Sequence, residues 1–390
     1  MTTVPYGARS SALAMLEALA KKHPVPLAAI VQLTRRCNLG CRHCFQVERT
    51  GSELGTDEWK LVLRRLADAG VLFLTFTGGE PLLRRDFVEL VREARALAFA
   101  IKLKTNGLLL DGATCEALAA AAVMEIHFSF YSADAERHDR VTGLAGSHAR
   151  TLAAARRMRD LGARVLLNCA LQADTFDGYG AVIEFAEAEA MDWSFDPGIQ
   201  VQEDGCSRPA DHRLAPGQLE RLYADPRLAL PPEADDVPEK LPVPVCRVGQ
   251  AMVAVAPNGD VWPCLSLLEP LGNLVESPLE RIWVGNPRLE RFSRICWSDL
   301  PECRGCELLG FCVRCHANAL HEDGDLLGPS RLACAGARAR ARAAGRLPGR
   351  PDDSGLAPEG ESRRLPFAGG AAEMAGEFTI RPRRLEEGQR

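Results

Sequence analysis

The sequence of 390 residues lacks the features that would carry a protein into or across a membrane. No apolar run approaches the roughly 20 residues that a helix needs to cross a bilayer. The N-terminus has no charged segment followed by an apolar one, so it does not resemble a secretory signal peptide. We therefore expect a cytoplasmic protein without a membrane partner.

The chain also lacks a strong surplus of charge and any internal repeat. Its formal net charge is -5 and its isoelectric point is near 6.0, so the charge balance does not indicate a nucleic acid as partner. The length is sufficient for one large domain and a smaller one.

Cysteine, by contrast, is abundant. Fourteen cysteines in a protein expected to stay in the cytoplasm indicate metal binding rather than disulfides. Three lie near residue 40 and seven lie between Cys246 and Cys334, which predicts two separate metal-binding regions. The other four are single, and scattered cysteines are usually small buried hydrophobic residues; they are Cys115, Cys169, Cys206 and Cys296.

Short apolar runs alternate with helix-length segments up to about residue 200. This pattern predicts parallel strands covered by helices, either as an open, partial (β/α)6 barrel or as a doubly wound open sheet. In both, reactive loops follow the C-terminal ends of the strands. We expect strands at 27–34, 71–77, 100–105, 123–131, 164–171 and 193–199, and helices at 10–23, 58–69 (with Thr56 as N-cap), 86–97, 113–121, 149–161 and 179–189.

Composition changes along the chain predict the domain boundaries. Residues 205–245 lose periodicity and are rich in proline, and the cysteine-rich region that follows has few regular elements. The end of the chain is of low complexity, with one strand-like patch at 378–380. The expected division is an N-terminal helix at 1–24, a core at 25–204, a linker at 205–245, a cysteine-rich domain at 246–335 and a flexible tail at 336–390.

The first cysteine motif, C-x3-C-x2-C, follows the first expected strand. Its members are Cys37, Cys41 and Cys44. Three thiolates on one loop can hold three irons of a 4Fe–4S cluster and leave the fourth iron open to another ligand. The alternatives are a zinc knuckle, for which His43 would supply the fourth ligand, or unrelated thiols.

This motif resembles that of the radical S-adenosylmethionine (SAM) enzymes, C-x3-C-x-aromatic-C, with His43 as the ring. Gly78, Gly79 and Glu80 directly follow the second expected strand and are similar to the family's Gly-Gly-Glu-Pro motif. The resemblance implies a partial (β/α)6 barrel in which the open iron chelates SAM and this second motif receives its α-ammonium. It also implies an enzyme that reductively cleaves SAM to a 5′-deoxyadenosyl radical, which abstracts hydrogen from the substrate.

Four further segments resemble parts of the family's SAM site. Thr142 stands where many relatives carry an arginine, so the neighbouring Arg140 is an alternative partner for the SAM carboxylate. Each of these residues has a plain structural role as its alternative. The resemblance implies cofactor contacts at Asn106 (in a Thr-Asn-Gly segment), Ser129, Arg140 or Thr142, and Asn168.

The second cysteine region begins with Cys246 and a Gly-x4-Cys motif that ends at Cys264, followed by four central cysteines (Cys303, Cys306, Cys312 and Cys315) and a final Cys334. This arrangement resembles the SPASM domain, which carries two auxiliary 4Fe–4S clusters. Its last central step is C-x2-C instead of the usual C-x3-C, and a zinc site at the four central cysteines is the alternative. The resemblance assigns Cys246, Cys264 and Cys315 to the nearer cluster, leaving its fourth ligand to Cys296, a non-cysteine group or an open iron. The distal cluster would take Cys303, Cys306, Cys312 and Cys334.

Members of this family mostly modify peptides and proteins, so the resemblance implies a peptide or protein substrate. Tetrapyrrole modification and sulfatase maturation are the alternatives, and a non-enzymatic iron–sulfur electron carrier is a remote one. We also expect an external one-electron donor such as flavodoxin or ferredoxin, and a separate leader-recognition protein if a leader guides the substrate. Cys206, in the loop after the sixth expected strand, is a candidate hydrogen-atom or electron donor to a substrate radical.

Overall fold

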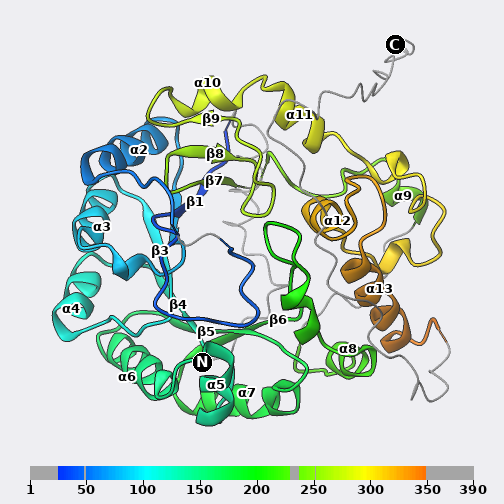
Figure 1. The fold of residues 1–390 in the computed structure, drawn as a ribbon, viewed down its shortest axis with the longest axis horizontal. Coiled ribbons are helices and arrows are strands. Elements are labelled where there is room, and N and C mark those ends of the chain that lie inside the picture. Colours follow the sequence, from blue (N-terminus) through cyan, green and yellow to red (C-terminus); the bar gives the residue numbers. More distant parts are fainter. Residues whose placement is uncertain (1–24, 48–49, 229–236, 251, 348–390) are drawn as a thin grey trace.

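The computed structural model describes residues 25–47, 50–228, 237–250 and 252–347 (Figure 1). The helix expected at 10–23, the patch at 378–380 and most of the expected tail lie outside these ranges. Within them, none of the helices combines the length and the apolar character that crossing a bilayer requires.

The fold is built on one curved nine-stranded sheet in the order β6-β5-β4-β3-β2-β1-β7-β8-β9, with β1 to β7 parallel. The first six strands follow the chain without the reversal that a doubly wound sheet contains, so the partial barrel is confirmed. These strands are β1 (Ala28–Gln32), β2 (Phe73–Thr77), β3 (Ala100–Thr105), β4 (Glu125–Ser129), β5 (Val165–Ala170) and β6 (Asp192–Asp196).

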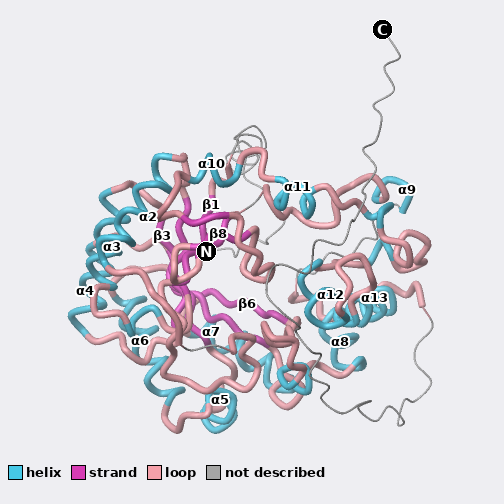
Figure 2. Tube along the Cα trace, turned by 45° about the horizontal axis from the view of Figure 1, so that its top comes forward, coloured by secondary structure: helices cyan, strands magenta, loops and turns pink. Residues whose placement is uncertain are grey.

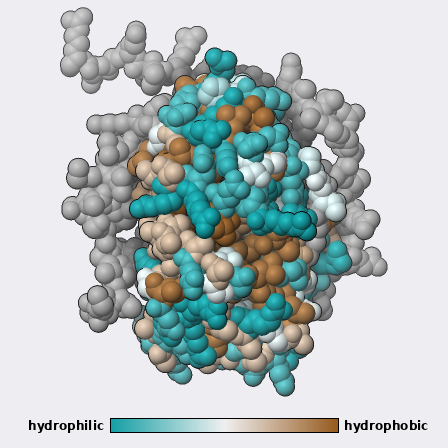
Figure 3. Space-filling view, turned by 90° about the vertical axis from the view of Figure 1, so that its left-hand side faces the viewer, coloured by the Kyte–Doolittle hydropathy of each residue, from teal (hydrophilic) through white to brown (hydrophobic). Residues whose placement is uncertain are grey.

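Helices cover the convex face of the sheet (Figure 1). In the first of them, Trp59, Val62, Leu63 and Leu66 recur at helical spacing and are fully buried against the sheet. The outward face of this layer is mostly hydrophilic, with smaller hydrophobic areas (Figure 3). The helices are α2 (Thr56–Asp68), α3 (Phe87–Ala96), α4 (Gly112–Ala120), α5 (Ala135–Thr142), α6 (Ser147–Asp160) and α7 (Tyr179–Ala188).

The N-cap expected at Thr56 is wrong by one residue. Gly55 is the N-cap, and its N–H donates to the Glu58 carboxylate at 2.8 Å. The Thr56 hydroxyl instead donates to Asp86 at 2.8 Å, because this tertiary partner is available beside the start of α3.

Each barrel strand presents alternate residues to the helices and to the barrel interior. In β5, Val165, Leu167 and Cys169 are buried on the helix side, whereas Asn168 and its alternate neighbours are half-buried on the other side. The interior face and the loops after the strands are therefore the places where a ligand can be held.

The cysteine-rich region contains more regular structure than we expected. Its first strand, β7 (Val253–Val255), pairs in parallel with β1 and so extends the barrel sheet. A three-residue strand is too short to show periodicity in a sequence. The remaining elements are β8 (Asp260–Trp262), β9 (Gly272–Asn273), α10 (Leu279–Trp283), α11 (Pro287–Ser293), α12 (His316–Asp323) and α13 (Arg331–Ala343), with short 3-10 turns at Trp297–Asp299 and Leu309–Phe311.

The stretch expected as a linker also contains helices, α8 (Pro216–Tyr223) and α9 (Val237–Lys240), after a 3-10 turn at Arg208–His212. Helix α8 packs along α13, which runs past Cys334 and beyond the boundary expected at 335 (Figures 1 and 2). Leu219 and Leu222 on α8 share a buried cluster with Ala339 on α13. The stretch therefore packs against the C-terminal region as part of the folded structure.

Candidate functional site

The loop that follows β1 carries the first three cysteines. All three of them, Cys37, Cys41 and Cys44, are half-buried. The backbone of α5 holds this loop, because the N–H of Gly40 donates to the Thr142 carbonyl at 3.1 Å. The cysteines therefore lie at the C-terminal edge of the parallel sheet, where its active sites open.

The Gly-Gly-Glu segment after β2 is fastened to the start of that loop. The N–H of Gly79 donates to the Thr34 carbonyl and the N–H of Glu80 to the Arg36 carbonyl, both at 2.8 Å. A Cβ atom on Gly78 would lie 2.4 Å from the Thr34 oxygen, and one on Gly79 would lie 2.2 Å from the Arg36 oxygen. Both positions require glycine because two backbone segments touch there.

The Glu80 carboxylate is fully buried beside this contact. It accepts hydrogen bonds from the Thr105 hydroxyl at 2.8 Å and from the N–H groups of Asn106 at 2.8 Å and Leu82 at 3.2 Å. Burial raises its pKa to about 7, although these bonds oppose the change. No described basic side chain forms an ion pair with it, so the site fits an ammonium group that would supply the missing positive charge.

Asn106 connects this carboxylate to the cysteine loop. While its N–H donates to Glu80, its side-chain amide donates to Asn38, which lies between the first two cysteines, at 2.8 Å. One residue at the end of β3 thus fixes the relative position of the two motifs.

The other expected SAM contacts fall into two groups. Ser129 and Asn168 are register partners on β4 and β5, and Asn168 accepts from the Ser194 hydroxyl on β6 at 2.8 Å. They form a polar row across three strands of the barrel interior. Ser194 was missed in the sequence, where only its alternate position within the strand could have indicated it.

Thr142 and Arg140 are placed differently. The Thr142 hydroxyl is buried and bonded locally, to Ser147 at 2.7 Å and to the Asp139 carbonyl at 3.1 Å. Arg140 is exposed. The Thr142 carbonyl also accepts the hydrogen bond from the N–H of Gly40 in the cysteine loop.

His43 is an aromatic support of the same loop. Its ring lies edge-on to Tyr131 with 4.8 Å between ring centroids, and its Nδ1 is 3.2 Å from the Gln172 amide. Burial, with Arg42 and His212 nearby, lowers its pKa to about 4, so it is neutral. The Tyr131 hydroxyl in turn contacts Ser129 and the Cys41 sulfur.

Cys206 is half-buried in a turn that lies against the segment after Cys44. The N–H of Glu203 donates to the Phe45 carbonyl at 3.0 Å, and the Arg208 guanidinium donates to the Cys206 sulfur at 3.4 Å. The turn is therefore next to the loop that carries the first three cysteines.

Two charged side chains that the sequence analysis did not select, Lys104 and Asp196, interact electrostatically. Lys104 lies near the end of β3 and Asp196 ends β6. Burial lowers the pKa of Lys104, and burial raises the pKa of Asp196 although Lys104 opposes this. Both residues are nevertheless exposed, so their side chains are accessible to a ligand.

The seven C-terminal cysteines form two groups. Cys246, Cys264 and Cys315 pack against one apolar cluster that includes Leu267 and Phe292. Burial raises the pKa of the Cys246 thiol to about 11, and the other two thiols add to the shift. We call these three residues the proximal cysteine group.

The second set, which we call the distal cysteine group, comprises Cys303, Cys306, Cys312 and Cys334. Burial raises the pKa of Cys312 to about 12, with further contributions from Cys334 and Cys303. Cys306 likewise contributes to a raised pKa of Cys303 and of Cys334. The structure thus separates Cys312 from Cys315, although only two residues lie between them.

Cys296 lies beside the distal group's apolar cluster, between Ile295 and Trp297. Its sulfur donates to the Arg294 carbonyl at 3.5 Å. The backbone of Cys296 also forms an isolated antiparallel β-bridge with Pro244.

Among the described residues, no three His, Cys, Asp or Glu side chains converge as ligands of a single metal ion. A zinc ion would need sulfurs about 2.3 Å from one point. A 4Fe–4S cluster is a larger body with its ligands spread around it, so the two cysteine groups and the Cys37 loop fit clusters better than zinc.

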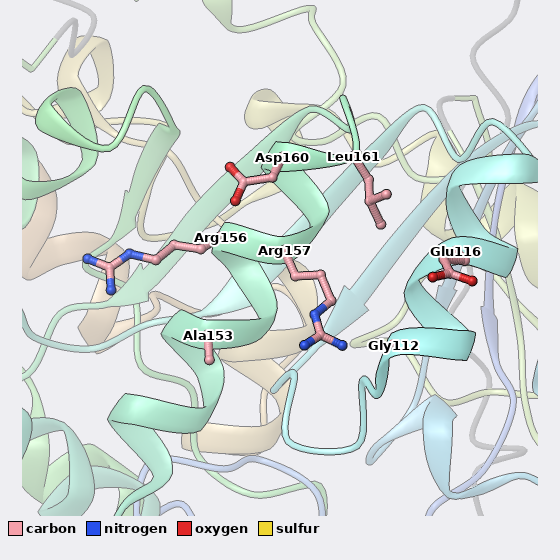
Figure 4. A pocket seen from close by; sticks show the side chains of 7 residues that line it. All are labelled: Gly112, Glu116, Ala153, Arg156, Arg157, Asp160 and Leu161. Atoms are coloured by element: carbon pink, nitrogen blue, oxygen red, sulfur yellow. The ribbon is translucent and has the colours of Figure 1, made fainter.

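A groove between α4 and α6 lies away from all these residues, in the outer helical layer. Arg157 extends from α6 to Gly112 on α4, with Glu116 opposite (Figure 4). It contains none of the cysteines or buried acids described above.

Comparison with known proteins assigns the family. The profile of the radical SAM superfamily matches residues 31–185, and that of the SPASM iron-sulfur cluster-binding domain matches residues 246–307. The chain is 31% identical over 329 residues to a protein named PqqA peptide cyclase from Granulibacter bethesdensis, covering 78% of this chain and 87% of that one. A protein of the same name from Gluconobacter oxydans is 33% identical, covering 76% and 87%. The chain belongs to the radical SAM superfamily and carries a SPASM domain.

Solved radical SAM structures share the fold of this radical SAM protein. Streptococcus suis SuiB bound to S-adenosylmethionine gives a TM-score of 0.58 at 20% identity, covering 81% of this chain and 80% of that one. Native anSMEcpe with bound AdoMet gives 0.64 at 17% identity, covering 82% and 97%. The cofactors of this radical SAM/SPASM protein are SAM and 4Fe–4S clusters.

Proposed function

We propose that this protein modifies a peptide by a radical reaction that begins with SAM, and that the modification is an intrachain crosslink. Its support is the similarity to PqqA peptide cyclases over 87% of their length. Similarity of that extent favours a peptide over a tetrapyrrole or a sulfatase. A simple electron carrier would not need the buried Glu80 site.

In this proposal Cys37, Cys41 and Cys44 hold the SAM-binding cluster. Gly78 and Gly79 fix the backbone beside it, and the buried Glu80 carboxylate receives the α-ammonium of SAM. Ser129 and Asn168 face the barrel interior, where the nucleoside would lie. When bound, the cluster and SAM supply the electron and the 5′-deoxyadenosyl radical that abstracts hydrogen from the substrate.

The proximal cysteine group would hold one auxiliary cluster and the distal group the other. The proximal group has three members, so one iron stays open or Cys296 or another group completes it. The proposed division of the chain follows the same sites, with a radical SAM core at 25–204 and a SPASM domain at 246–335, where the two family profiles also lie.

Forming a crosslink removes two hydrogens from the peptide, one as an atom and the other as a proton and an electron. The chain's own groups for the proton are Lys104 and Asp196, two exposed side chains that interact electrostatically with each other. We propose that the Lys104 amine takes that proton at Nζ. An auxiliary cluster, held by the proximal or the distal cysteine group, would accept the electron.

The reaction also requires an external one-electron donor such as flavodoxin or ferredoxin. A leader-guided peptide would further require a separate recognition protein or a binding surface on this chain. We propose both of these partners, and we propose that the protein acts in the cytoplasm. Cys206 remains a candidate donor to a substrate radical, and an unchanged product and stereochemistry from Cys206→Ala would remove it.

The test uses anaerobically reconstituted protein, dithionite, SAM and a PqqA peptide as probe. We expect 5′-deoxyadenosine and a peptide that has lost two hydrogens by mass. The control is the triple variant Cys37→Ala, Cys41→Ala, Cys44→Ala, which should form no 5′-deoxyadenosine but retain the iron of the auxiliary sites. Reductive cleavage of SAM by the triple variant would show that the cluster assignment is wrong, and cleavage without any change in the peptide would show that the probe is not the substrate.

A further inference from the structure

Arg314 lies at the boundary between the two C-terminal cysteine groups. It stands between Cys312, which belongs to the distal group, and Cys315, which belongs to the proximal group. The guanidinium interacts electrostatically with Cys303 and Cys312 on one side and with Cys315 on the other.

The Arg314 side chain is almost completely buried, with the residue only 3% exposed. All of its hydrogen-bond acceptors are neutral. It donates to the Gly328 carbonyl at 3.0 Å, to the Leu326 carbonyl at 2.6 Å and to Nδ1 of His316 at 2.8 Å. Because arginine can only donate, Nδ1 of His316 is the acceptor and carries no proton, so that ring adds no charge.

A buried cation is costly unless a negative charge lies close to it. In the described part of the chain no carboxylate forms an ion pair with Arg314, and Asp325, the acid that acts on it electrostatically, is exposed. The groups that can supply the missing charge are the cysteines on both sides, which bind iron as thiolates.

We propose that Arg314 is the shared counter-charge of the two auxiliary clusters and raises the reduction potentials of both. This inference rests on the ligand assignment proposed above. Adding an electron to a cluster makes it more negative, and a fixed cation at low dielectric reduces the cost of that step. Arg314 is a positioning residue in this role, because it touches neither SAM nor substrate.

The test is a potentiometric titration, followed by electron paramagnetic resonance, of the full-length reconstituted protein. Arg314→Met removes the charge and keeps an unbranched chain, whereas Arg314→Lys keeps the charge. At the potential where half of the wild-type auxiliary clusters are reduced, we expect Arg314→Met to lower the ratio of reduced to oxidised cluster at least tenfold. That is a shift of about 59 mV for a one-electron couple. Arg314→Lys should stay within threefold of wild type.

Arg304 provides a matched control, because it also lies next to cluster cysteines, between Cys303 and Cys306, but is exposed. Water screens its charge, so Arg304→Met should leave the ratio within twofold of wild type. The SAM-binding cluster is the internal reference, and its potential should be the same in all variants.

The alternatives have distinct results. Equal potentials in Arg314→Met and wild type, with iron content unchanged, overturn the inference alone. Loss of auxiliary iron from Arg314→Met but not from Arg314→Lys supports it, because the charge is then what the clusters need. Loss from both variants overturns it, since the guanidinium would then act only through its bonds to Gly328 and Leu326. If the wild-type protein holds iron for only one auxiliary cluster, the ligand assignment is overturned as well.

Discussion

The N–H of Glu80 donates to the carbonyl of Arg36 at 2.8 Å, and Arg36 directly precedes Cys37. This bond joins the Gly-Gly-Glu segment to the first cysteine loop through the backbone. The position of the Glu80 carboxylate and the position of the three cysteines are therefore coupled, although 33 residues lie between Cys44 and Gly78. A change that loosens one motif should disturb the other.

Gly79→Ala tests this coupling. A Cβ at this position would lie 2.2 Å from the Arg36 oxygen, so the two backbones must separate. We expect the free energy of unfolding to fall by about 1–3 kcal/mol, the usual cost of overpacking, and the iron of the SAM-binding cluster to be lost. Chemical denaturation and iron analysis measure both effects.

The matched control for that prediction is Gly217→Ala on α8, where an added Cβ meets nothing within 4 Å. Alanine favours a helix over glycine by about 1 kcal/mol, so stability should be unchanged or slightly higher. Full iron content in Gly79→Ala would contradict the coupling.

Glu80→Gln tests the charge of the buried carboxylate. The variant keeps the shape but cannot pair with an ammonium, so we expect SAM affinity to fall at least tenfold, about 1.4 kcal/mol. Anaerobic calorimetry measures the affinity. An unchanged affinity would show that Glu80 serves only the Thr105 and Asn106 bonds.

The same carboxylate predicts a pH dependence with a definite sign. Its pKa is raised to about 7 in the folded protein from an ordinary value of 4.5. The protonated form is thus favoured by folding, and its contribution to stability is lost as pH rises between these values. Without SAM, the wild type should lose stability relative to Glu80→Gln from about pH 4.5 to 7, whereas SAM should bind the wild type more tightly as pH rises through 7.

Single cysteine variants should remove different clusters. Cys315→Ala should disrupt the proximal cluster and Cys312→Ala the distal one, because the structure places their sulfurs in different groups. Iron content and resonance spectra distinguish the two losses. Cys296→Ala should retain both clusters with unchanged spectra if one proximal iron is open, and a changed proximal spectrum would identify Cys296 as its fourth ligand.

Lys104→Met tests the proposed proton acceptor. We expect 5′-deoxyadenosine to form while the crosslinked peptide decreases at least tenfold, because hydrogen abstraction would no longer be followed by proton loss. Lys102→Met is the matched control. Lys102 lies on the same face of β3 but pairs with Glu125 at 2.8 Å, so its loss should leave the ratio of product to 5′-deoxyadenosine unchanged.

Much of the barrel could be predicted because its signals are local. Except for α5, which the sequence analysis did not predict, the elements from β1 to α7 lie within about two residues of the expected apolar runs and helical segments. Each depends on periodicity within a window of a few turns. The region after residue 205 was harder, because α8 is short and gains its stability from burying Leu219 and Leu222 in a cluster shared with Ala339.

The sequence by itself determined which residues can carry the chemistry. The spacing of the cysteines in the first loop and the two glycines before Glu80 are set by chemical requirements, and both can be read directly from the sequence. Tertiary structure alone decided that β7 joins β1, that Lys104 interacts electrostatically with Asp196 and that Arg314 is buried between two cysteine groups. These relationships arise from contacts between distant segments, and their energies depend on burial and on the distance between charges, which no local pattern in the chain records.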